Sequence, residues 1–311
     1  MKVLVLGGTG FIGRHAILAL LARGHEVVVG TRYPARAFRK LPAAARACET
    51  RSTRLERLTA RGSWDGLLEG IDVVVNCVGI LRERGEESYE RIHHLAPAAL
   101  VGDCARLRVR RLIHVSALGL QAGARSAFLT SKLRGEKAVK SGRIDWTIVR
   151  PSLLDGEGGF GARWMRMVAR WPVHFVPAEA KGRIAALDVG ELGEAIAVLC
   201  EVKERADLRE VELGGTALRT MREYLAALRR MFGYAPALCV ELPAWLARPA
   251  SRLCDLLHFS PFSFGHLELM RRDNAPGINL LPYLLKRTPK AIGLEERSCV
   301  PGARASAPAS P

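Results

Sequence analysis

A glycine-rich run near the N-terminus has the residue types and spacing of a site for a negatively charged ligand. The run GGTGFIG follows an apolar segment and precedes a stretch with apolar residues at helical spacing. Gly7 permits a tight turn, Gly10 lets the backbone approach a pyrophosphate, and Gly13 allows close packing of helix on strand. The free N–H groups at the start of the helix attract phosphate. This context predicts a dinucleotide site formed by Gly7, Thr9, Gly10, Phe11, Ile12 and Gly13.

The end of the second predicted strand indicates which dinucleotide is bound. Arg32 lies nineteen residues beyond Gly13, where NAD enzymes usually carry an acidic residue for the ribose 2′-hydroxyl. An arginine there suits a 2′-phosphate, because its guanidinium forms charge-assisted hydrogen bonds with phosphate oxygens. We therefore expect NADP(H), bound by Arg32 with help from Arg36. For Arg36 and Lys40, a solvated basic helix face is an equally good interpretation.

Short apolar runs alternate with helical patterns through the first half of the chain, which is typical of βαβ units and a parallel sheet. The predicted strands are residues 2–6, 26–30, 72–76, 111–116 and 146–150, and the predicted helices are residues 11–23, 89–107 and 128–141. The stretch 41–62 is polar and irregular, so the expected third strand is not placed. The sequence thus predicts an α/β fold in which helices flank a parallel, Rossmann-type sheet.

The second half of the chain is richer in Gly and Pro punctuation. Helices are predicted over residues 163–171, 189–200, 220–232 and 242–257, with a short strand over 210–213. We therefore expect a nucleotide-binding domain over residues 1–155, a smaller α+β region for a substrate or partner over 156–297, and a disordered tail over 298–311.

The ends of the later strands should complete the site, because ligands of open α/β sheets lie beyond the carboxyl ends of the strands. One strand ends at Ser116, and Phe128 and Lys132 share a face of the next helix because they are four residues apart. Asp188 is best interpreted as a helix N-cap and Glu157 as a turn residue. The residues expected to line the cofactor at these strand ends are Cys77, Val78, Gly79 and Pro151.

The composition excludes several classes of protein. The net charge of +16, from 47 basic and 31 acidic residues, is not accompanied by a nucleic-acid reading module, so no nucleic acid is expected. The seven cysteines include no CxxC pair, which favours neither a disulfide framework nor a zinc site and suits the cytoplasm. His93 and His94 are adjacent in a helix and face different directions, so no metal site is expected. The sequence contains no membrane-spanning run and no signal-peptide pattern.

Residues 242–257 and 264–285 predict a surface-binding element. They mix bulky apolar residues with arginines, as an interfacial amphipathic segment does. The alternative is that the apolar residues pack on a substrate cleft. The apolar residues are Trp245, Leu246, Leu253, Leu256, Leu257, Phe259, Phe262 and Phe264, and the arginines are Arg248, Arg252, Arg271 and Arg272.

The motifs GGTGFIGRH, VVNCVGI, HVSALG, SKLRGE and WTIVRPS, with the segment 183–192, resemble the extended and atypical short-chain dehydrogenases/reductases. Within that superfamily, the chain is similar to bacterial relatives of the nucleotide-binding accessory subunit of respiratory complex I. The likeness covers residues 1–199 and, more weakly, 264–281. It implies a Rossmann fold with a small C-terminal region, a bound nicotinamide dinucleotide and, often, the loss of ordinary dehydrogenase activity.

The resemblance also implies an active site of Ser, Tyr and, four residues after the Tyr, Lys. Ser116 matches the Ser and Lys132 the Lys, but Phe128 occupies the position of the Tyr. In a reductase the phenol donates the proton that accompanies hydride transfer, and a nearby Lys lowers its pKa. Phenylalanine cannot do this, although Lys132 can still bond the nicotinamide ribose. Other candidate proton donors are Tyr89, Thr130 and Ser131.

Two functions therefore remain open. In the first, the chain is a non-catalytic NADP(H)-binding protein that docks onto a partner, such as a respiratory or quinone-linked membrane assembly. It would then be cytoplasmic and peripheral at the inner face of the membrane. In the second, it is an NADPH-dependent reductase of a quinone or carbonyl substrate with a different proton donor. The loss of the tyrosine favours the first function, and the retention of Ser116 and Lys132 favours the second.

Overall fold

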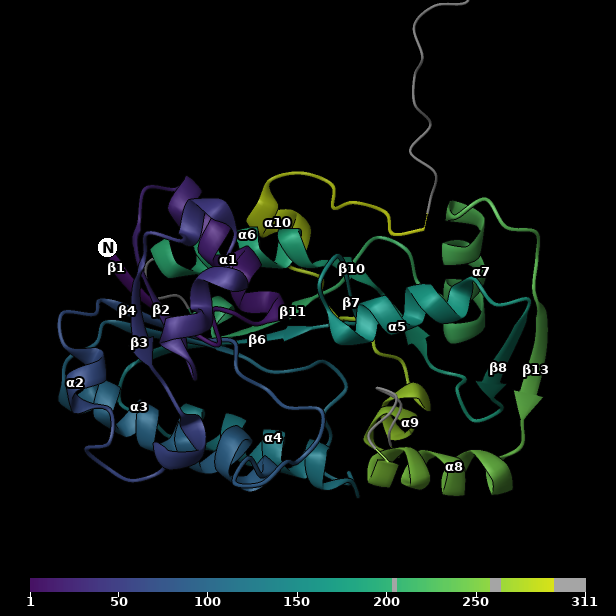
Figure 1. The fold of residues 1–311 in the computed structure, drawn as a ribbon, viewed down its shortest axis with the longest axis horizontal. Coiled ribbons are helices and arrows are strands. Elements are labelled where there is room, and N and C mark those ends of the chain that lie inside the picture. The colour runs from purple at the N-terminus through teal and green to yellow at the C-terminus, as the bar shows by residue number, and fades with distance from the viewer. Residues whose placement is uncertain (203–205, 258–263, 294–311) are drawn as a thin grey trace, which may run out of the picture.

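A parallel sheet of seven strands, in the order β11-β6-β5-β4-β1-β2-β3, forms the centre of the molecule (Figure 1). The computed structural model describes residues 1–202, 206–257 and 264–293, without the side chains of residues 255–257. The predicted tail over 298–311, Phe259 and Phe262 and the side chains of Leu256 and Leu257 lie outside this description. The strands of the sheet are β1 (Lys2–Leu6), β2 (Glu26–Thr31), β3 (Glu49–Ser52), β4 (Val73–Asn76), β5 (Arg111–Val115), β6 (Asp145–Pro151) and β11 (Glu210–Leu213).

The predicted parallel α/β fold is confirmed, and the third strand is now placed. β3 reads Glu-Thr-Arg-Ser and forms one edge of the sheet, with both end residues exposed. An edge strand that buries so little has no need of apolar alternation, so the sequence carries no strand signal there. The chain order reverses between β1 and β4, and this switch point is where open α/β sheets bind their ligands.

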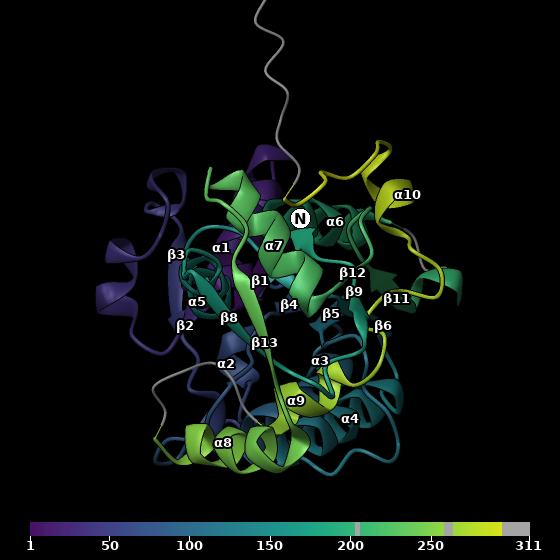
Figure 2. The same cartoon turned by 90° about the vertical axis from the view of Figure 1, so that its right-hand side faces the viewer.

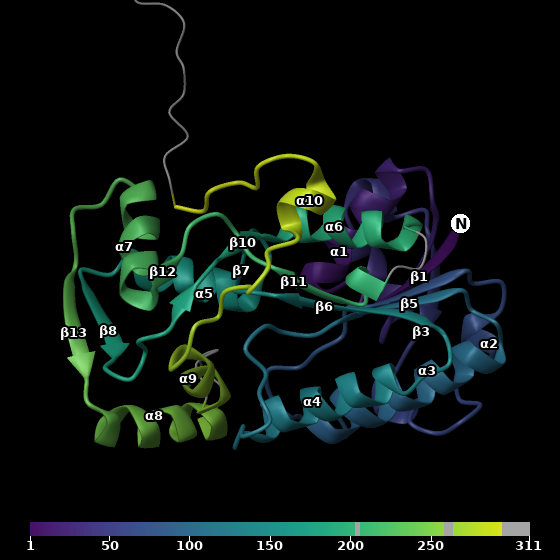
Figure 3. The ribbon, with the colours of Figure 1, turned by 180° about the vertical axis from the view of Figure 1, so that it is seen from behind.

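Helices cover both faces of the sheet (Figures 1 and 3). On one face, Val3 and Val5 pack with Ile17 of α1 and Ile196 of α6. On the other face, Leu4 and Leu6 belong to a second core with Leu100 of α3. Alternate residues of β1 therefore pack into the cores on opposite faces of the sheet, because successive side chains of a strand point to opposite faces. The first layer holds α1 (Phe11–Ala22), α6 (Val189–Glu201) and α10 (Leu281–Leu285), and the second holds α2 (Asp65–Leu68), α3 (Ala96–Arg106) and α4 (Ala127–Lys140).

The helix predicted over 89–107 is confirmed in position, but it is not uniform. It begins with a π-helical turn, η4 (Glu90–Leu95), and continues as α3. Apolar spacing does not distinguish the two, because a single wide turn hardly changes which side chains face the core. The remaining short helical turns are η1 (Pro34–Arg39), η2 (Ala43–Ala45), η3 (Leu55–Arg57) and η5 (Ala206–Leu208).

The sheet and the helices that cover it extend beyond residue 155, the predicted end of the nucleotide-binding domain. β11 pairs in parallel with β6, and α6 packs its apolar face on the core beside α1. Both elements come from the second half of the chain. β11 has four residues and lies among turns and loops, so its pattern indicated no membership of the main sheet.

The rest of the second half forms a smaller region at one end of the sheet (Figure 2). Met165 of α5 and Leu225 and Leu228 of α7 belong to its own core. None of the described helices is long and apolar enough to cross a membrane. The elements are β7 (Leu154–Asp155), α5 (Phe160–Ala169), β8 (Val173–Pro177), β9 (Arg183–Ile184), β10 (Leu187–Asp188), β12 (Arg219–Thr220), α7 (Met221–Met231), β13 (Leu238–Leu242), α8 (Ala244–Leu257) and α9 (Phe264–Met270).

Candidate functional site

The glycine run forms a tight turn between β1 and α1 at the carboxyl edge of the sheet. Gly7 has a φ of +71°, a left-handed conformation that favours glycine, and its carbonyl accepts a 2.8 Å hydrogen bond from Gly10 N. A Cβ at Gly13 would collide with that same carbonyl. Gly10 is the N-cap of α1 and offers no side-chain cap, so the first N–H groups of the helix remain for a ligand. Thr9, Phe11 and Ile12 lie in the same turn and the first turn of the helix.

Two buried hydroxyls at the same edge fit a nucleotide. Thr53 follows β3 and Ser116 follows β5; they are 1% and 7% exposed. The Thr53 hydroxyl oxygen has no hydrogen-bond partner among the described residues, whereas the Ser116 hydroxyl lies beside Glu136 and helps to lower the pKa of that carboxyl. An unsatisfied buried polar group costs about 1–3 kcal/mol, so Thr53 favours an arrangement in which a bound ligand supplies the partner. Sequence reasoning missed Thr53 because the third strand had no recognisable pattern.

Arg32 lies directly after β2, at the adenosine end of the expected site. Its side chain is half exposed and forms an ion pair with Glu87. The guanidinium carbons of Arg32 and Arg54 lie 5.9 and 5.8 Å from the ring centroid of Tyr33. Arg36 and Lys40 are exposed in and after η1. The structure thus places basic groups where they were expected, and it adds Glu87 and Arg54, which no motif identified.

The loop after β4 lies beside the glycine run, since a Cβ at Gly7 would lie 3.0 Å from the side chain of Val78. Val78 N donates to Asn76 Oδ1 at 3.1 Å, and Cys77 N donates to the carbonyl of Leu6 at 3.1 Å. Burial raises the pKa of the Cys77 thiol, which therefore stays protonated and serves as packing. A Cβ at Gly79 would lie 3.6 Å from Lys132 Nζ, so this loop also lies beside the lysine. Pro151 is the last residue of β6 at this edge.

Phe128 and Lys132 lie on the same face of α4, as their spacing predicts. Phe128 is 8% exposed, and Lys132 Nζ lies 5.8 Å from the centroid of its ring. The ring meets Tyr89 and His93 edge-on at 5.7 and 5.6 Å and stacks on His266 at 5.7 Å. Phe128 therefore completes an aromatic cluster, whose members are Tyr89, His93, Phe128 and His266.

Burial controls the ionisation of the groups around this cluster. It lowers the pKa of Lys132 to about 8, although the nearby Glu136 opposes the shift. Burial and then the charge of Lys132 lower the pKa of His114 to about 4 and hold that of His93 well below its ordinary value. Both imidazoles are therefore neutral at pH 7, and Lys132 is a cation beside the cluster.

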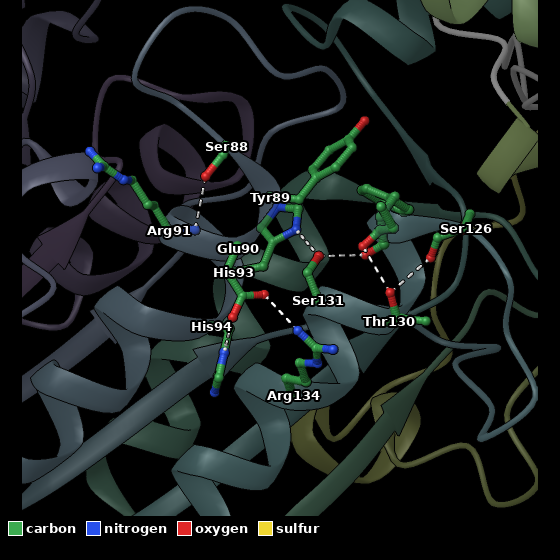
Figure 4. A network of polar contacts seen from close by, with 12 residues as sticks. Ser88, Tyr89, Glu90, Arg91, His93, His94, Ser126, Thr130, Ser131 and Arg134 are labelled. Atoms are coloured by element: carbon green, nitrogen blue, oxygen red, sulfur yellow. Dashed lines mark hydrogen bonds and ion pairs between the residues drawn. The ribbon is translucent and has the colours of Figure 1, made fainter.

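The three alternative proton donors differ in their surroundings (Figure 4). Thr130 Oγ1 donates back to the carbonyl of Ser126 at 3.1 Å. Ser131 Oγ donates to the carbonyl of Phe128 at 3.0 Å and lies 3.0 Å from His93 Nδ1. The hydroxyl of Tyr89 points away from Ser131 and donates to the carbonyl of Leu81 at 2.8 Å.

Tyr89 also lines a pocket, which distinguishes it from the other two candidates. The pocket has a volume of about 470 Å³, and Phe128 contributes to the same wall. A larger groove of about 1190 Å³ lies between α1, α6 and α10, and no residue of the glycine run lines it. The smaller pocket is therefore the one that adjoins the cluster of Phe128, and its basic lining residues are Arg82, Arg125 and Arg252.

The other residues that the sequence singled out have structural partners. Asp188 Oδ1 accepts a 3.1 Å hydrogen bond from Glu191 N and caps α6, which confirms the predicted role. His93 contacts Ser131, whereas His94 Nδ1 lies 2.7 Å from Glu90, so the two rings point to different neighbours. Across the described ranges, no three His, Cys, Asp or Glu side chains gather closely enough to hold a metal ion.

Sequence comparisons agree with this geometry. Residues 7–167, more than half of the chain, match the family described as NAD(P)H-binding. The chain is 28% identical over 284 residues to the ceramide reductase of Caulobacter vibrioides, covering 88% of this chain and 86% of that protein. It is also 28% identical over 223 residues to the mitochondrial NADH dehydrogenase (ubiquinone) 1 alpha subcomplex subunit 9 of Dictyostelium discoideum. That match covers 71% of this chain and 61% of the relative, so the chain spans less than two thirds of the relative's length.

Solved structures show the same fold. The UDP-glucose 4-epimerase of Bifidobacterium longum in complex with NAD+ and UDP superimposes with a TM-score of 0.68 at 16% identity, covering 94% of this chain and 95% of that one. At this identity the likeness concerns the fold alone. The matched NAD(P)H-binding family supports a nicotinamide dinucleotide as the cofactor. The predicted resemblance is confirmed: the chain belongs to the NAD(P)H-binding family of Rossmann-type, short-chain dehydrogenase/reductase-like proteins.

Proposed function

We propose that this chain is an NADP(H)-binding protein that lacks the tyrosine-dependent chemistry of ordinary short-chain reductases. The observation that carries the proposal is Phe128, which lies one turn before Lys132 on the same face of α4. A reductase needs a phenol in that place to donate a proton. Nicotinamide dinucleotides supply hydride chemistry when bound, and the residues of this chain would supply binding and orientation.

The residues that would hold NADP(H) lie along one edge of the sheet. The turn from Gly7 to Gly13 and the start of α1 would bind the pyrophosphate, and Lys132 would donate a hydrogen bond to the nicotinamide ribose. Arg32 would bind the 2′-phosphate. Ser116, which is buried directly after β5, would line the nicotinamide end.

The imidazoles of His93 and His114 are poor substitutes for the missing phenol. His93 Nε2 accepts a 3.1 Å hydrogen bond from Ile80 N, so its proton lies on Nδ1, directed to Ser131. His114 Nδ1 lies 3.2 Å from the side-chain amide of Asn76. Because burial lowers the pKa of both rings, neither is a ready source of protons at pH 7. These contacts favour binding without proton transfer.

The substitution Phe128→Tyr tests this proposal directly. It restores a phenol four residues before Lys132, and general acid catalysis is worth about 10² to 10⁴ in rate. We expect wild type to leave NADPH unoxidised across a panel of quinones and carbonyl compounds, and the variant to gain slow turnover. Mass spectrometry of the nucleotide released from the purified protein identifies the bound species. Turnover by wild type that Phe128→Tyr leaves unchanged would contradict the proposal.

A second function is favoured by the place of Tyr89. Its ring meets Phe128 edge-on and lines the pocket beside it, so a substrate there could receive a proton from the Tyr89 hydroxyl. The chain would then be an NADPH-dependent reductase of a quinone or carbonyl substrate, and one relative is named a ceramide reductase. If wild type proves active, Tyr89→Phe should abolish the turnover, with Thr130→Val as the matched control on α4.

We also propose that the protein acts at a membrane surface or on a membrane-bound partner, at the cytoplasmic face. Val173 and Phe175 of β8 pair in register with Leu238 and Val240 of β13, so these four side chains share one face of the ribbon. Phe175 and Leu238 are 55% and 66% exposed. Trp245, at the start of the adjoining α8, is 75% exposed, as an interfacial anchor would be. The similarity to a subunit named for NADH dehydrogenase (ubiquinone) supports a respiratory partner.

A further inference from the structure

The arginine expected to bind the 2′-phosphate already has a partner within the chain. Arg32 forms an ion pair with Glu87, and the two side chains are 50% and 20% exposed. The carboxylate of Glu87 therefore lies where a phosphate on the ribose would have to approach Arg32. A free arginine at this position would indicate a strong preference for NADP(H), but a paired one does not.

The backbone of Glu87 is held in a small hairpin in the loop after β4. Arg84 and Glu87 exchange two backbone hydrogen bonds of 3.0 Å, and Glu83 Oε1 accepts a 2.7 Å hydrogen bond from Tyr89 N. The neighbouring Glu86 pairs with Arg57 of η3 at 3.1 Å. The hairpin is thus fastened on both sides of Glu87. Its carboxylate reaches the end of β2 although it comes from the loop after another strand.

Three arginines of this corner have a carboxylate beside them within the chain. Arg32 is paired with Glu87, Arg57 with Glu86, and Arg54 lies 4.0 Å from Glu56. A 2′-phosphate, which carries a charge of about −1.5 to −2, would meet a carboxylate beside each of these arginines. It would have to displace Glu87 to contact Arg32. A ribose hydroxyl would leave the ion pair in place and could donate a hydrogen bond to Glu87.

We propose that Glu87 is a specificity-determining residue, which weakens the preference for NADP(H) over NAD(H) by competing with the 2′-phosphate for Arg32. This inference rests on the proposed role of Arg32. Nucleotide preference then depends on two residues from separate loops: Arg32 attracts the 2′-phosphate, and Glu87 repels it. The preference of the wild type is therefore smaller than Arg32 alone would give.

The test compares affinities for NADPH and NADH in the purified, nucleotide-free full chain. Glu87→Gln keeps the shape of the side chain and removes its charge, so affinity for NADPH should rise about fivefold while that for NADH changes less than about twofold. Glu86→Gln, one residue earlier in the same hairpin, is the matched control and should change neither affinity. In the Arg32→Ala background, Glu87→Gln should lose most of its effect, and melting temperatures confirm that every variant folds.

The outcomes separate this inference from the proposal on which it rests. If Arg32→Ala lowers the NADPH to NADH preference and Glu87→Gln leaves it unchanged, Arg32 keeps its role and the inference about Glu87 is wrong. If Arg32→Ala leaves the preference unchanged, the role of Arg32 fails and the inference fails with it. A gain from Glu86→Gln equal to that from Glu87→Gln would indicate a general charge effect and would also overturn the inference.

Discussion

Lys132 should destabilise the nucleotide-free protein at neutral pH. Burial lowers the pKa of its ammonium from 10.5 to about 8 in the folded chain. Below pH 8 the lysine is protonated in both the folded and the unfolded state, so the folded state carries the full cost of the buried charge. Between about pH 8 and 10.5 the unfolded state binds more protons, and stability rises with pH. We therefore expect Lys132→Met to stabilise the protein at pH 7.

The magnitude follows from the size of the pKa shift. A shift of one pKa unit corresponds to about 1.4 kcal/mol, so the shift from 10.5 to about 8 gives an upper limit of about 3.5 kcal/mol. The side chain is partly exposed, so solvent screening reduces the expected gain to about 1–2 kcal/mol. Substitution by methionine also keeps the apolar stem against Phe128.

Urea unfolding of the nucleotide-free protein at a series of pH values measures this difference. The gap between Lys132→Met and wild type should be largest at pH 7 and should narrow as the pH rises toward 10. Lys137→Met, an exposed position on the same helix, is the control and should shift stability by less than about 0.5 kcal/mol at every pH. A variant that is less stable than wild type at pH 7, or a gap that does not depend on pH, would refute the reasoning. Saturating NADPH should reverse the order, because wild type binds the nucleotide more tightly.

Three further results are expected. Arg32→Ala should weaken NADPH binding by about tenfold and NADH binding much less, measured by titration with both nucleotides. Asp188→Ala removes the cap of α6 and should cost about 1 kcal/mol in urea unfolding without changing nucleotide preference, whereas an altered preference would assign Asp188 to the site. The wild type should float with anionic vesicles at low salt, and the double variant Leu238→Ser/Trp245→Ser should remain in the bottom fraction. Tyr283→Ser, which alters an exposed aromatic residue on α10, is the control, and failure of the wild type to float would exclude direct membrane binding.

The sequence identified the parts of the molecule whose patterns are local. The glycine run, the apolar strands and the spacing of Phe128 and Lys132 each depend on neighbours in the chain, and all were located correctly. β3 was not placed, because an edge strand needs little apolar burial. The membership of β11 in the main sheet was also missed, since pairing with β6 joins residues about sixty positions apart.

Other features of the site could not be predicted, because no local pattern carries them. Glu87 meets Arg32 through a hairpin that follows a different strand. His266 reaches Phe128 from α9, more than a hundred residues further along the chain. The sequence placed Phe128 on one helix face with Lys132, and the structure adds a packed cluster of four rings around it. Contacts of this kind follow from topology, which composition and periodicity do not specify.

β11 follows β6, its partner in the sheet, by about sixty residues, and this separation affects how the protein folds during synthesis. During synthesis, β6 leaves the ribosome as an unpaired edge, and its partner strand follows only after the intervening segment has been translated. The core beside α1 is likewise incomplete until α6 emerges. An uncovered strand edge and an uncovered apolar helix face are the surfaces on which nascent chains aggregate and chaperones bind. A fragment that stops at residue 155 should therefore be insoluble, whereas one that includes α6 and β11 retains the helix that covers the core and the strand that pairs with β6.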